Sequence, residues 1–159
     1  MRAQSWVTWL SKPINTTNLL SYYIPLTGVG AHSLFTAQLF SPTLLKNIFN
    51  EYEYAASRSL MAASLVGSGL FLFYRPHLCK TPTWSRVEYS VLGSVIYNFG
   101  SLLLAIFIKP FIPKKSSIAL KTTFAFGITT LLASRTLKYL NHIDEKTVIK
   151  NEYTFDHLE

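Results

Sequence analysis

Hydrophobic residues run along the chain in long, nearly continuous stretches that charged residues interrupt at intervals. The stretches with almost no Lys, Arg, Asp or Glu are residues 13–45, 59–74, 89–108 and 116–134. Only Lys121 breaks the last of them. A helix that crosses the roughly 30 Å hydrocarbon core of a bilayer needs about 20 mostly apolar residues, so the pattern predicts membrane-spanning helices.

The predicted fold is all-α, a multi-pass membrane protein with four transmembrane helices in a small bundle. The expected spans are residues 19–40, 55–74, 87–108 and 117–137. Spanning strands would alternate apolar and polar residues, which these runs do not do. The third span is the most uniformly apolar, whereas the first holds Pro25 and several polar side chains. Three spans, with a first helix that lies partly at the interface, is the main alternative.

The segments that flank residues 19–140 have a different character. Residues 1–18 contain Trp6, Trp9 and Leu10 on one helical face, which predicts an interfacial segment because tryptophan favours the membrane surface. No apolar core of a secretory signal follows Arg2. Residues 141–159 carry a net charge of −3 and are expected to form an acidic soluble tail.

The first connection between spans contains a second amphipathic pattern. Apolar side chains recur at helical spacing in Leu44, Leu45, Ile48, Phe49 and Tyr52. Either this segment forms a short helix at the membrane interface, or it continues directly into the second span.

Composition supports the membrane class and excludes others. Apolar residues form 49% of the 159 residues and charged residues 14%, against roughly 25% charged in soluble domains. Mean hydropathy is +0.24, which excludes a disordered chain. A single cysteine excludes an intramolecular disulfide and a multi-cysteine metal site.

The net charge of +7 is explained by topology better than by nucleic-acid binding. The basic residues border apolar spans and form no recognised nucleic-acid motif, so no nucleic-acid partner is expected. With four spans, nine Lys and Arg fall on the side of the termini and six on the opposite side. The positive-inside rule therefore favours termini on the matrix or cytoplasmic side. The Asn15-Thr16-Thr17 sequon is read as a chance match.

No catalytic, metal or cofactor site is predicted. The chain has no phosphate-binding loop and no HExxH or GxSxG motif. His77 and Cys79 share a loop without further ligands, and His32 has no second histidine at comparable depth to complete a haem site. An enzyme is therefore the less favoured interpretation.

Polar residues inside the spans are the more informative candidates. They are His32, Gln38, Tyr97 and Asn98. An amide in lipid needs a partner, so Asn98 should face another helix, either to fix packing or to line a transport path. Small residues that predict helix contacts are Ser59, Ala63, Gly67, Gly93 and Gly100.

These observations favour a non-catalytic accessory subunit or assembly/scaffold factor of a larger membrane complex. The expected partners are the lipid bilayer and other membrane subunits, in the mitochondrial inner membrane or the endoplasmic reticulum. A small transporter or channel that uses the intramembrane polar residues is one alternative. An intramembrane enzyme that acts on a lipid or quinone-like substrate is the other.

Overall fold

The computed structural model describes residues 15–113 and 116–156, with side chains described as far as Thr147. The described residues form helices and short connections, with no strand among them. The long elements are α3 (Ile24–Phe40), α5 (Glu53–Phe73), α7 (Thr83–Ile108) and α8 (Ile118–Asp156). The short ones are α2 (Thr16–Asn18), η1 (Leu19–Tyr23), α4 (Thr43–Phe49), η2 (Asn50–Tyr52), α6 (Pro76–Cys79) and η3 (Lys109–Phe111). The all-α prediction is confirmed.

The four long helices overlap the four predicted spans, but only two helical stretches are long and apolar enough to cross a membrane. These stretches, found among the described residues, are Thr43–Phe73 and Thr83–Phe111. The regular part of α3 is 17 residues long and includes His32 and Gln38. α8 carries Lys121 near its start and Arg135 farther along. Four spans are therefore not shown by length and composition.

The first long helix begins with an irregular turn that its sequence explains. Proline has no backbone N–H, so Pro25 cannot donate to the carbonyl four residues before it. Residues Leu19–Tyr23 form a π-type turn instead, in which the Ile24 N–H donates to the Leu19 carbonyl. Thr16–Phe40 thus continues as one helical rod across the proline.

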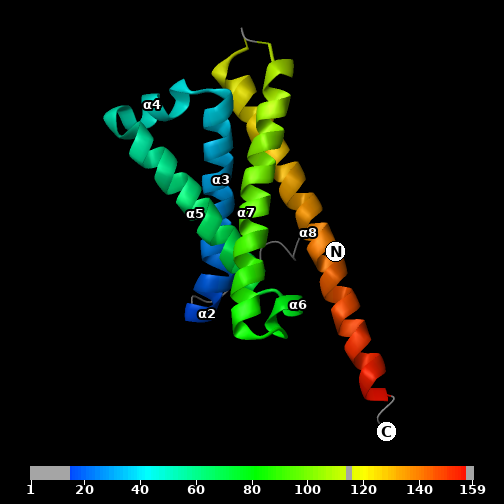
Figure 1. Ribbon diagram of the computed structural model, residues 1–159. Helices are drawn as coiled ribbons and strands as arrows, with labels where there is room; N and C mark the ends of the chain where they lie inside the picture. The colour runs from blue at the N-terminus through cyan, green and yellow to red at the C-terminus, as the bar shows by residue number, and fades with distance from the viewer. Residues whose placement is uncertain (1–14, 114–115, 157–159) are drawn as a thin grey trace.

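The long helices run antiparallel to their neighbours in chain order, with α3 at the centre (Figure 1). α3 contacts α5, α7 and α8, and α5 also contacts α7. α5 crosses α3 obliquely, so its end lies against α7 while its beginning, beside α4, lies away from α7 (Figure 1). α8 continues past the end of the other helices toward the C-terminus.

The crossing of α3 and α5 depends on two glycines. A Cβ placed on Gly67 would lie 2.6 Å from the Gly28 Cα and 3.0 Å from the Ile24 carbonyl oxygen. A Cβ on Gly28 would meet the Gly67 Cα at 2.7 Å. The two backbones therefore touch directly, as small residues allow where helices approach closely.

An apolar cluster closes the end of the bundle where α3 and α7 finish and α8 begins. Its buried members are Ala37, Phe40, Ala105, Ile112 and Ala125. Three of these five are alanines, so the helix backbones lie close together here as well. Leu44 of α4 packs against the same cluster, which ties the short helix to this end.

Along α7, burial is inverted relative to a helix of a soluble protein. Its buried residues are Ser90, Ser94, Asn98, Ser101, Leu102 and Ala105. Its exposed positions include Val91 (57%), Ile96 (62%), Leu103 (68%) and Phe107 (71%). Soluble proteins bury large apolar residues and rarely leave continuous apolar surface exposed. The outer face of α7 therefore suits lipid better than water.

Gly67→Ala should destabilise the bundle, by about 1–3 kcal/mol, because the added methyl group forces α3 and α5 apart. The measurement is thermal unfolding of the purified chain in a mild detergent. Gly100→Ala is the matched control, because a Cβ there meets nothing within 4 Å. Equal melting temperatures for the two variants would contradict the close crossing.

Candidate functional site

Asn98 lies at the centre of a hydrogen-bonded polar cluster between α5 and α7. The Ser64 hydroxyl donates to the Asn98 Oδ1. The Asn98 amide donates from Nδ2 to the Ser68 Oγ at 2.8 Å and to the Ser94 carbonyl oxygen at 2.8 Å. Asn98 is 2% exposed. Both of its amide hydrogens and its carbonyl oxygen are thus used within the bundle.

Two serines complete this part of the cluster. Their hydroxyl oxygens, Ser68 Oγ and Ser94 Oγ, lie 2.7 Å apart. Ser68 also reaches the Ser64 carbonyl at 2.8 Å, and Ser94 reaches the Leu65 carbonyl at 2.6 Å. A four-residue spacing places Ser64 and Ser68 on one face of α5, and the same spacing places Ser94 and Asn98 on one face of α7. The sequence therefore aligns the two polar rows that meet.

His32 connects α3 to the same region. Its Nε2 lies 2.9 Å from the Ser101 Oγ, and Ser101 donates to the Asn98 carbonyl oxygen at 2.8 Å. Either of the two atoms can be the donor in the bond between Nε2 and Ser101, depending on the tautomer of His32. His32 is 3% exposed, and its ring centroid lies 5.4 Å from that of Tyr97. The cluster thus joins three helices.

The four polar residues that were predicted to lie inside the spans have different surroundings. His32, Tyr97 and Asn98 lie together, the last two being neighbours on α7. Gln38 lies two turns beyond His32 on α3, and its Oε1 is buried without a hydrogen-bond partner among the described residues. Among the described residues, no hydrogen bond joins the Gln38 side chain to the cluster.

Of the residues that were predicted to lie at helix contacts, some lie against another helix and others do not. Gly67 touches Gly28 directly, and the Ala63 carbonyl oxygen lies 3.2 Å from a Cβ built on Gly28. A Cβ on Gly93 would meet a methyl group of Leu72 on α5 at 2.6 Å. A Cβ on Gly100 would meet nothing within 4 Å.

Ser59, the remaining helix-contact candidate, is exposed and bonds the Ala56 carbonyl of its own helix. Sequence reasoning did not single out Ser68 or pair Gly28 with Gly67. The four-residue serine spacing on α5 was the available signal for Ser68.

A second polar cluster lies at the opposite end of the bundle from the apolar cluster. Arg75 donates from Nη1 to the Asp144 Oδ2 at 3.0 Å and to the Asn141 Oδ1 at 3.0 Å. The His77 N–H donates to the Asp144 Oδ1 at 3.1 Å, and its Nδ1 lies 2.5 Å from the same oxygen. This cluster fastens α8 to the connection between α5 and α7, which includes α6.

Arg75 keeps its charge in this position. Partial burial lowers the pKa of Arg75 from its ordinary value, and the adjacent Asp144 carboxylate opposes that change. An arginine stays protonated at physiological pH even so. The acidic tail was predicted to begin at residue 141. That position lies inside α8, close to Asp144, through which α8 is bound to the bundle.

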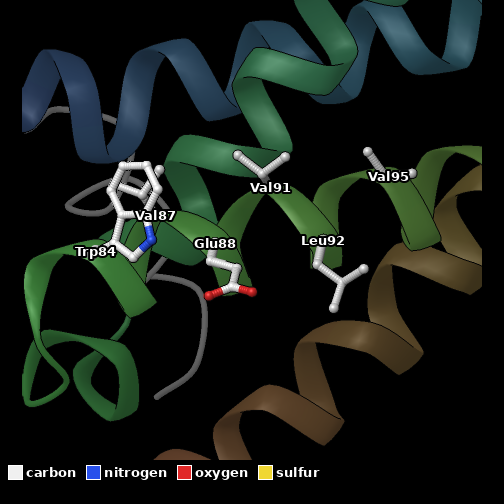
Figure 2. Close-up of a pocket in the computed structure, with 6 residues that line it drawn as sticks. All are labelled: Trp84, Val87, Glu88, Val91, Leu92 and Val95. Atoms are coloured by element: carbon white, nitrogen blue, oxygen red, sulfur yellow. The ribbon is translucent and has the colours of Figure 1, made fainter.

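The hollow in Figure 2 lies apart from both polar clusters. Its lining consists of six side chains that all come from α7: Trp84, Val87, Glu88, Val91, Leu92 and Val95. They follow one stripe of the helix, and Trp84 is 80% exposed. This is an outer surface and not an enclosed binding cavity. Among the described residues, no group of three or more His, Cys, Asp or Glu could hold a metal ion.

Comparisons with known proteins give no family for the chain. No family model matches it, and neither a curated protein nor a solved structure is significantly similar to it. Its function must therefore be argued from its own geometry.

Asn98→Leu should lower the stability of the bundle by about 1 kcal/mol, since interhelical hydrogen bonds in membrane proteins contribute on that scale. The substitution leaves Ser64 and Ser68 without their shared partner. Denaturant titration in mixed micelles measures the change. Leu103→Ala is the control, because Leu103 is 68% exposed on the same helix. If Leu103→Ala lowered the free energy of unfolding as much as Asn98→Leu, the central role of the Asn98 amide would be contradicted.

Asp144→Asn should release α8 from the α5–α7 connection. The Arg75 guanidinium would lose its carboxylate, and hydrogen bonds to charged groups contribute about 1.5–3 kcal/mol. Limited trypsin digestion should then cut the α8 extension at Lys146 several-fold faster. Glu145→Gln removes an equal charge from the exposed neighbour and should leave the rate unchanged. Equal rates in both variants would show that Asp144 does not hold the helix.

Proposed function

We propose that the chain is a non-catalytic multi-pass membrane protein that serves as an accessory subunit or assembly/scaffold factor of a larger membrane complex. The observation that carries the proposal is the inverted burial of the bundle. Small polar side chains bond one another inside, while large apolar side chains cover the outside. In lipid the apolar exterior carries no penalty, and the polar interior must be paired internally.

The same reasoning extends the proposal to four spans. α3 contacts α5, α7 and α8, so its buried polar side chains, His32, Ser33 and Thr36, need not face lipid. The helical rod Thr16–Phe40, 25 residues at 1.5 Å each, is about 37 Å long and can cross the hydrocarbon core. α8 is longer still, and Thr122, Thr123 and Thr129 return their hydroxyl groups to carbonyls of their own helix. Such bonds let threonine enter an apolar environment.

The geometry supports a packing role for the central cluster over transport or catalysis. The Asn98 amide groups are bonded to serines and to the backbone, which leaves no amide donor for a solute. The described hollow lies on the outer face of α7 and not at His32 or Asn98. A flux assay separates the alternatives: a well-folded Asn98→Leu variant with reduced flux would favour the transporter.

The surface of α7 supports an interaction with another membrane subunit. Gly100 is exposed, and a Cβ built on it would meet nothing within 4 Å, so a helix of a partner can approach the α7 backbone closely there. Large apolar residues flank it, with Ile96 62% and Leu103 68% exposed. The expected compartments are the mitochondrial inner membrane and the endoplasmic reticulum, with both termini on the matrix or cytoplasmic side.

The test combines extraction with native sizing. Alkaline carbonate should leave the full chain in the membrane pellet, and mild detergent should release it as a complex larger than the monomer. Gly100→Leu should lose the complex while its melting temperature stays unchanged. Extraction by carbonate would overturn the membrane proposal. A pure monomer in several mild detergents would overturn the subunit proposal.

A further inference from the structure

The short helix α4 turns aside from the axis of α5. Figure 1 shows α4 leading sideways from the end of α3 to the beginning of α5. The break falls at Asn50, which has φ 47° and ψ −111° and is the one non-glycine residue with positive φ among those described. The sequence left open whether this segment forms a separate short helix or continues directly into the second span. The structure shows a separate helix, α4, that points away from the axis of α5.

The two ends of α4 differ sharply in burial. Leu45 is completely buried, and Leu44 packs against the apolar cluster that closes the bundle. At the C-terminal end of α4 and in the residues that follow, large side chains are exposed: Ile48 (61%) and Phe49 (42%) of α4, Tyr52 (74%) of η2 and Tyr54 (75%) of α5. Phe111 of η3, at the same end of the bundle, is 76% exposed. Aromatic residues are enriched where a membrane meets water.

Positive charge accompanies these aromatic residues. Lys46 on α4 and Lys109 on η3 are exposed, as is Arg58 in the second turn of α5. Lys121 lies in the first turn of α8, and the acidic residues here are Glu51 and Glu53. Among the described residues, this end of the bundle therefore combines four basic residues with two acidic ones.

We propose that α4 and η3 form an interfacial platform that binds the headgroups of anionic phospholipids, with Lys46 and Lys109 as the central cations. The inference rests on the proposed membrane insertion. Basic residues beside a membrane attract anionic lipid, and the exposed aromatic side chains hold them at headgroup depth. The Asn50 turn directs α4 along the membrane surface instead of through it, which sets Lys46 beside the headgroups.

The test measures lipid selectivity of the full chain in vesicles of phosphatidylcholine with 20% phosphatidylglycerol. Spin-labelled analogues of the two lipids report how much of each is immobilised by the protein. The wild-type chain should prefer the anionic lipid, and Lys46→Glu with Lys109→Glu should reduce that preference by roughly fivefold per lysine at low salt. Lys46→Arg with Lys109→Arg should preserve it.

The control reverses two exposed lysines at the other end, Lys80→Glu with Lys138→Glu, and should reduce the preference by a smaller factor. An equal reduction in that control would show a general charge effect and would overturn the platform. Equal immobilisation of both lipids by a wild-type chain that resists carbonate extraction would overturn this inference alone. A chain that carbonate releases would overturn the proposed membrane insertion with it.

Discussion

The centre of the bundle depends on one constraint: a polar group enclosed between α3, α5 and α7 is costly to leave without a hydrogen-bond partner. Asn98 meets this constraint with every hydrogen-bonding group of its side chain. Its bonds to serines of α5 fix that helix against α7, and the bond between Ser101 and His32 adds α3. The orientation of α7 follows, since a helix that turns its serines and its asparagine inward must turn its valines, leucines and phenylalanines outward.

This arrangement explains why α3 has a mixed composition. α3 contacts three other helices, and it carries His32, Ser33 and Thr36 at buried positions. Close backbone contact at Gly28 and Gly67 brings its polar face within reach of α7. The two ends of the bundle then differ in chemistry. One is closed by alanines and larger apolar side chains, and the other by the ion pair of Arg75 with Asp144.

Helix positions followed from the sequence because charges mark the ends of apolar stretches, and the importance of Asn98 followed because it is the amide in the most apolar stretch. The interaction partners of these polar residues could not be predicted from the sequence. Ser64 and Ser68 resemble the small residues of any membrane helix, and nothing local predicts which face of α5 meets α7. Asp144 and Arg75 lie 69 residues apart, and a pair so distant emerges only when the helices are placed. The continuation of α8 had a visible signal, since no proline or glycine follows Gly127.

The continuation of α8 beyond Asp144 carries the end of the helix away from the bundle. From its attachment at Asp144 the helix proceeds a further 12 residues to Asp156, a rise of about 18 Å. Electrostatic interactions are screened over about 8 Å at physiological ionic strength. The helix therefore holds Asp156 more than two screening lengths beyond the point of attachment. A charged partner that contacts Asp156 is consequently screened from the ion pair of Arg75 with Asp144.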